Sequence, residues 1–139
     1  MKKFELTSEF VLSVFGGKLF QIKALIQFSD INAGELGGYI EKEENLNQRG
    51  DAWVFGNARV SGDALISGNA WVSGNALISG NARVFGNAIV SDNARVSGDA
   101  LISGNTLVTG NAWVSGHALV SGDALISGNA LVSDNAPGL

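Results

Sequence analysis

The chain has 139 residues, a formal net charge of −4 and 45% hydrophobic residues, which suits one small folded domain and excludes a disordered tract. It contains no cysteine, so disulfides, thiolate metal sites and cysteine nucleophiles are excluded. No lysine follows Lys42, which argues against duplex nucleic acid as a partner. Charged residues interrupt the N-terminal apolar segments that a signal peptide or membrane span needs. We therefore expect a soluble, intracellular protein.

Residues 1–49 differ in composition and in period from the rest of the chain, so we expect a separate N-terminal cap. Two apolar segments, 10–15 and 18–26, flank the pair Gly16-Gly17. Two such segments around a tight glycine turn are the signal of a β-hairpin. A hairpin in this place would cover an open strand edge, which otherwise invites pairing with other chains.

Residues 34–48 join this hairpin to the remainder of the chain. Ile40 and Leu46 lie six residues apart, and a further step of six reaches Ala52. Six residues is also the period of the chain from Gly50 onward, so we expect one degenerate coil of the same kind in this segment.

Residues 50–139 divide into fifteen units of six residues without an insertion. Most units open with Gly-Asn or Gly-Asp, carry Ala at the third position, where Thr106 is the exception, and carry Val or Ile at the fifth. A glycine in every unit would destabilise a helix by about 1 kcal/mol each time. Ala and Val two positions apart point to one face of a short strand, and Gly-Asn suits a corner. Each unit is therefore predicted to be a strand and a corner, stacked into a solenoid.

The run Val-Ser-Gly-Asn-Ala resembles the hexapeptide repeat of left-handed parallel β-helix proteins. The resemblance implies an all-β triangular prism with three hexapeptides, eighteen residues, in each coil, and so about five regular coils over residues 50–139. At about 4.8 Å per coil the prism is roughly 24 Å tall. The position after the aliphatic residue is usually Ser, with Phe55 and Phe85 as exceptions, where the family often carries Gly, Ala or an acid.

The N-terminal sequence resembles hexapeptide-repeat proteins that are common in phages and bacterial prophages. The matching pattern runs from Phe4-Glu-Leu-Thr through Gly37-Gly-Tyr-Ile to Gly56-Asn-Ala-Arg. The resemblance implies the cytoplasm of a bacterial host as the location. Some of these relatives are labelled acyltransferases, but such a label follows the fold and does not itself supply chemistry.

With eighteen residues in each coil, the fourth-position side chains form three outward columns. The first column is entirely apolar and contains Trp53, Trp71, Ile89, Leu107 and Leu125. The second contains Arg59, Leu77, Arg95, Trp113 and Leu131, and the third contains Leu65, Arg83, Leu101, Leu119 and Pro137. Monomers rarely expose a contiguous apolar strip, so we expect the first column to be the interface of a homodimer or homotrimer. Cover by the N-terminal segment and a ligand platform are the alternatives.

The second column is the candidate ligand-binding surface. Arg59, Arg95 and Trp113 could stack a planar ligand such as a base. The alternative is that the arginines only keep a mixed interface soluble and paired.

The corners of the solenoid carry polar columns of their own. One is all asparagine, Asn57, Asn75, Asn93, Asn111 and Asn129, and is expected to form a ladder of amide hydrogen bonds. Another places His117 one coil above Asp99, with about 5 Å between the backbones. An Asp-oriented histidine can act as a general base, and resemblance to hexapeptide acyltransferases implies such a role. The alternative is structural, because His117 fills an ordinary corner position and no inserted loop builds an acyl-donor pocket.

The expected function is a non-enzymatic, self-associating binding module of phage or prophage type. In one form it is a counter-defence protein, whose clefts between protomers sequester a host protein or a small nucleotide signal. No cofactor is expected, and no metal, because a three-histidine zinc site needs more than the single histidine of this chain. The alternatives are an acyltransferase that uses His117 and a structural spacer or virion component.

Overall fold

The computed structural model describes residues 2–13 and 16–133. Within this part it contains seventeen β-strands and one short 3-10 helix, η1 (Glu43–Asn45). Three longer strands come first: β1 (Phe4–Leu12), β2 (Lys18–Ala24) and β3 (Leu36–Ile40). Each repeat then contributes a two-residue strand: β4 (Trp53–Val54), β5 (Arg59–Val60), β6 (Leu65–Ile66), β7 (Trp71–Val72), β8 (Leu77–Ile78), β9 (Arg83–Val84), β10 (Ile89–Val90), β11 (Arg95–Val96), β12 (Leu101–Ile102), β13 (Leu107–Val108), β14 (Trp113–Val114), β15 (Leu119–Val120), β16 (Leu125–Ile126) and β17 (Leu131–Val132).

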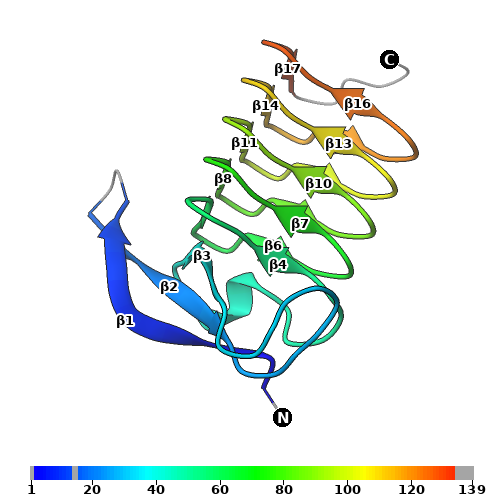
Figure 1. Cartoon of the computed structure of the whole chain (residues 1–139). Helices are drawn as coiled ribbons and strands as arrows, with labels where there is room; N and C mark the ends of the chain where they lie inside the picture. The colour runs from blue at the N-terminus through cyan, green and yellow to red at the C-terminus, as the bar shows by residue number, and fades with distance from the viewer. Residues whose placement is uncertain (1, 14–15, 134–139) are drawn as a thin grey trace.

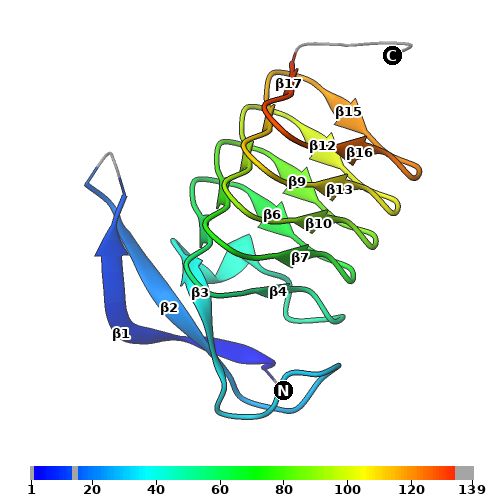
Figure 2. The same ribbon diagram turned by 45° about the horizontal axis from the view of Figure 1, so that its top comes forward.

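The two-residue strands form three parallel sheets, one for each side of the solenoid (Figure 1 and Figure 2). The first face consists of β4, β7, β10, β13 and β16, the second face of β5, β8, β11, β14 and β17, and the third face of β6, β9, β12 and β15. Within each face, successive strands lie eighteen residues apart and pair in register, as Arg95 does with Trp113. The predicted all-β parallel β-helix of about five coils is confirmed in this three-sided stack. The last predicted unit, residues 134–139 with Pro137, lies outside the described residues.

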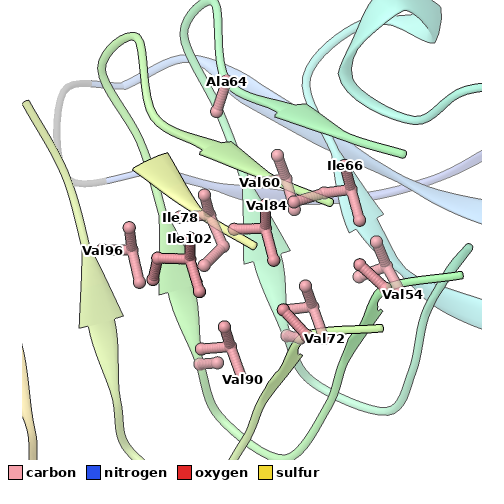
Figure 3. Close-up of a cluster of buried hydrophobic side chains, with 14 of the residues drawn as sticks. Val54, Val60, Ala64, Ile66, Val72, Ile78, Val84, Val90, Val96 and Ile102 are labelled. Atoms are coloured by element: carbon pink, nitrogen blue, oxygen red, sulfur yellow. The ribbon is translucent and has the colours of Figure 1, made fainter. Parts of the chain in front are cut away.

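The third and fifth residues of the repeats point into the solenoid, as the spacing predicts. Both columns are buried, over Ala52–Ala118 and over Val54–Val120. Figure 3 shows the aliphatic side chains of successive coils packed against one another. Each buried Val or Ile stabilises the fold by about 1.5–3 kcal/mol relative to exposure, so stacking supplies the core that one repeat lacks. Thr106 is buried at an alanine position, and its hydroxyl donates to the carbonyl of Ser103 at 2.7 Å.

The corners explain why most repeats contain glycine. Gly104 has a φ of 69°, and a Cβ atom there would lie 2.7 Å from the backbone nitrogen of Gly122 in the next coil. Positive φ is unfavourable for most L-residues, and the close approach leaves no room for a side chain. Asp92 is an exception with a φ of 60°, and its carboxylate accepts a hydrogen bond from the amide of Gly110 at 3.1 Å. Short polar residues tolerate this region better than others.

The N-terminal hairpin is present, although its first strand begins well before the expected segment 10–15. β1 and β2 pair antiparallel, β2 pairs with β3, and β3 runs parallel to β5. The hairpin therefore extends the sheet of the second face, and it stands beside the coils (Figure 1). β1 begins at Phe4, whose side chain is buried in the core. Residues 14 and 15 lie outside the described part.

The segment expected to form a degenerate coil holds β3 and η1. Ile40 lies against Val60 and Leu46 lies against Ile66, so this coil takes twenty residues where the regular coils take eighteen. The two additional residues lie between Leu46 and β4. The side chain of Asn45 substitutes for a strand here, because it donates to two backbone carbonyls at the edge of the third face, at 3.1 and 2.8 Å.

The first face has no preceding strand at its N-terminal edge, and Lys3 takes the place of one. Its Nζ donates to the carbonyl oxygens of Gly50 and Ala52, at 3.2 and 2.8 Å, and lies 4.8 Å from the ring centroid of Phe28. The side chain of Gln48 accepts a hydrogen bond from the backbone amide of Lys3 at 2.6 Å. Burial lowers the pKa of Lys3 to about 8. These contacts fasten the N-terminal segment to the first coil.

Candidate functional site

The first outward column exists in register, but its first member is not on the surface. Trp53 lies beside Trp71 in the sheet, yet its side chain is fully buried. Phe4 and Phe28 cover it, with ring centroids 6.3 and 5.3 Å away. The assignment of Trp53 to an oligomer interface is therefore wrong. The N-terminal segment covers this end of the column, which was the predicted alternative.

The remainder of the first column lies along an open side of the solenoid. Trp71 is half-buried against Phe55, with 5.2 Å between ring centroids. Leu107 is also half-buried, whereas Ile89 and Leu125 are exposed, the latter by 64%. We call these four residues the first-face strip: Trp71, Ile89, Leu107 and Leu125. It stays the predicted interface between copies of the chain.

The second outward column is longer than the repeats alone indicate. β3 adds Tyr39, which lies beside Arg59, so the order along the face is Tyr39, Arg59, Leu77, Arg95, Trp113 and Leu131. Sequence reasoning missed Tyr39 because the longer first coil shifts it out of the six-residue register. The pair Tyr39-Ile40 nevertheless has the same order, outward aromatic then inward aliphatic, as Trp53-Val54, and this was the available signal.

Arg95 and Trp113 form a stacked pair on this face. The guanidinium carbon lies 5.8 Å from the ring centroid of Trp113, within the range of a cation–π contact. The indole nitrogen donates to the hydroxyl of Ser97 at 3.4 Å. Trp113 is 46% exposed, so the contacts with Arg95 and Ser97 orient the indole while part of the residue stays accessible to a ligand.

Arg59 lies in a cleft between the hairpin and the second face. The lining residues of the cleft are Ser13, Leu19, Arg59, Ser61, Leu77, Ile78 and Ser79. Ser13 and Leu19 come from the hairpin, and the others come from β5, β8 and the residues that follow them. Sequence reasoning selected Arg59 but could not find the hairpin wall, because the repeat does not specify where the hairpin lies.

The arginines of the second face have no acidic partner in the described part of the chain. The ion pairs there are Lys2–Glu43 and Lys42–Asp63, and Asp99 lies beside His117. The side chain of Arg59 is half-buried, so its charge is partly removed from water in a chain that is acidic overall. Guanidinium groups bind planar and tetrahedral oxyanions through paired hydrogen bonds. The second face therefore offers two cations without internal counter-ions.

His117 and Asp99 lie together, as the column predicts. The Nδ1 atom of His117 is 3.3 Å from a carboxylate oxygen of Asp99, and Asn81 donates to the other oxygen at 3.1 Å. Both members of the pair are at least half exposed. The arrangement orients the imidazole, but neither residue lines the hairpin cleft.

Some of the side chains in the asparagine columns are joined by hydrogen bonds between successive coils. The all-asparagine column has an amide hydrogen bond from Asn111 to Asn129, at 3.2 Å. The longer ladder is at another corner, where Asn69, Asn87, Asn105 and Asp123 are joined in sequence at 3.0–3.2 Å. These bonds run between coils, so they stabilise the stack.

The structure describes residues 2–13 and 16–133. No three His, Cys, Asp or Glu side chains there lie close enough together to hold a metal ion. In the same part of the chain, no helix has the length and apolarity needed to cross a membrane.

The repeats are similar to a known repeat family. Four segments, residues 52–68, 58–74, 76–92 and 90–104, match the YdcK beta solenoid repeat, and they span the coils from β4 to β12. No curated protein matches the chain. With these matches and with parallel strands stacked on three faces, the chain is a β-solenoid repeat protein.

Proposed function

We propose that this β-solenoid is a non-enzymatic binding module that self-associates and holds a partner on its second face. The observation that carries the proposal is the pair of arginines without internal counter-ions, Arg59 beside the hairpin cleft and Arg95 stacked on Trp113. Cations that a fold leaves unpaired on one face are suited to an anionic partner.

The solenoid gives these groups fixed spacing. Arg59 and Arg95 are two coils apart, so their backbones are separated by about 10 Å, and Trp113 is one coil further. Both arginines sit on strands that are hydrogen-bonded on both sides. A partner therefore meets a surface that loses little conformational entropy on binding.

The type of module and its setting follow from the sequence resemblance. The N-terminal pattern supports a phage or prophage origin and the cytoplasm of a bacterial host. A counter-defence role is the instance we favour, in which assembled copies sequester a host protein or a small nucleotide signal. The first-face strip supports self-association as a dimer or trimer.

The test compares partner retention by matched variants expressed in the same host. Arg59→Ala together with Arg95→Ala should abolish co-purification of the partner. Arg83→Ala is the control, because Arg83 has the same repeat position on the third face. Unchanged retention by the double variant would contradict the proposal.

A hexapeptide acyltransferase is the second candidate, and the 3.3 Å contact between His117 and Asp99 favours it. It predicts that an acyl thioester of coenzyme A is consumed and that His117→Ala abolishes turnover. The binding module predicts that neither occurs. A structural spacer or virion component, the third candidate, predicts that no ligand is retained at all.

A further inference from the structure

We infer that the cleft between the hairpin and the second face is a binding site for an organic phosphate, with Arg59 as its anion-binding residue. The inference rests on the proposed function and deepens it. It names a ligand class and places the site within a single chain rather than between protomers.

The charge of Arg59 is the first step. Its side chain is half-buried, and within the described residues no carboxylate lies within ion-pairing distance and no acceptor receives a hydrogen bond from it. Partial burial of an unpaired cation costs free energy, and an anion in the cleft recovers that cost. An anionic ligand therefore fits the site better than a neutral one.

The hydroxyl groups select phosphate over carboxylate. A guanidinium group can satisfy both oxygens of a carboxylate on its own. The lining of this cleft also includes Ser13, Ser61 and Ser79, and a serine hydroxyl can donate a further hydrogen bond. A phosphate monoester has three terminal oxygens, one more than a carboxylate offers. It can therefore accept hydrogen bonds from the guanidinium group and from the serine hydroxyls together.

The apolar residues of the cleft lining would contact the organic part of the ligand. Leu19 is buried in the hairpin wall, and Leu77 is half-buried on the opposite wall. Apolar walls with a few placed polar groups are the usual lining of small-molecule sites. Beyond Leu77 the same face carries the Arg95–Trp113 pair, which could stack a planar group on a longer ligand.

The test is isothermal titration calorimetry of the full chain at low ionic strength with three probes. These are phenyl phosphate, inorganic phosphate, which lacks the apolar body, and benzoate, which lacks the phosphate. Phenyl phosphate should bind at least about tenfold more tightly than either of the others. Equal or weaker binding of phenyl phosphate than of benzoate would overturn the choice of phosphate.

Matched variants locate the binding. Arg59→Gln should weaken phenyl phosphate at least about tenfold, whereas Arg83→Gln, at the same repeat position on the third face, should change it less than about twofold. Leu77→Ala should weaken phenyl phosphate but not inorganic phosphate. Equal losses in the Arg59 and Arg83 variants would mean non-specific charge attraction and would refute the site. Thermal melts that match the wild type show that each variant is folded.

Failure of this inference and failure of the proposed function give different results. If no probe binds at millimolar concentration while a partner co-purifies through Arg59 and Arg95, the phosphate site is wrong and the binding module stands. If phenyl phosphate binds through Arg59 while the double variant keeps every partner, the proposed function fails and the phosphate site stands.

Discussion

The ammonium group of Lys3 replaces a strand at the edge of the first face, and this makes stability depend on pH. Burial lowers the pKa of Lys3 to about 8 from 10.5, an effect that Asp51 partly offsets. Between these values the unfolded chain binds more protons than the folded chain, so the free energy of unfolding rises with pH across this window.

This prediction is checked by urea denaturation at pH 7.5 and at pH 9.5. The wild type should be more stable at the higher pH, and Lys3→Met should lose most of that increase. Lys2→Met is the control, because Lys2 is exposed and pairs with Glu43, and it should keep the increase. The same pH dependence in wild type and Lys3→Met would show that another group is responsible.

A corner position favours glycine for two reasons, the positive φ and the close approach of the next coil, and Gly104 and Gly122 allow the two to be measured separately. Both have positive φ, 69° and 72°, but only at Gly104 would a Cβ atom meet the backbone of the next coil. Gly122→Ala should therefore cost about 1–2 kcal/mol, the cost of the left-handed conformation. Gly104→Ala should cost clearly more, because the two coils must also move apart. Denaturant titrations measure both, and equal costs would mean that the close approach is relieved by a small shift.

At the scale of elements, the first-face strip is the predicted interface on β7, β10, β13 and β16. Leu107→Glu places a charge in the middle of this strip and should dissociate the oligomer, because an unpaired charge in a buried interface is costly. Leu101→Glu is the control, since Leu101 is also an outward, half-buried residue, on the third face. Sedimentation velocity reports the change. A Leu107→Glu variant that sediments like the wild-type oligomer would remove the strip from the interface.

The repeats could be predicted from sequence because the six residues of each unit contain the pattern that makes its strand and its corner. Outward and inward residues alternate within every unit. A uniform length of six keeps the units in register, and the eighteen-residue coil implied by the family resemblance then gives each strand its partner. The burial of Trp53 could not be predicted in this way, because its cover comes from Phe4 and Phe28, which no periodicity connects to it. Tyr39 was missed for a related reason, since two additional residues in the first coil interrupt the register.

The candidate site was predictable only in part. The arginine and tryptophan column followed from the six-residue period together with the eighteen-residue coil that the family resemblance implies, and so did the position of His117 above Asp99. The cleft depends on how the hairpin packs beside the second face, which is decided by tertiary contacts of Leu19 and Ser13 rather than by any repeated pattern.

On the scale of the whole molecule, the solenoid is a stack in which each coil contacts its neighbours. Its N-terminal end is covered by β3, by the side chain of Asn45 and by Lys3, which together occupy the backbone carbonyls of the first coil. The three faces then have different surfaces. The first is apolar, the second carries the arginine column and the hairpin cleft, and the third mixes leucine with Arg83.

Copies of this chain are proposed to assemble and to hold a partner. Native mass spectrometry of the protein purified from its own host measures both properties in one experiment. We expect a dimer or trimer that carries additional mass, and we expect the Arg59→Ala, Arg95→Ala double variant to lose that additional mass. A bare monomer would contradict both the first-face interface and the second-face binding site.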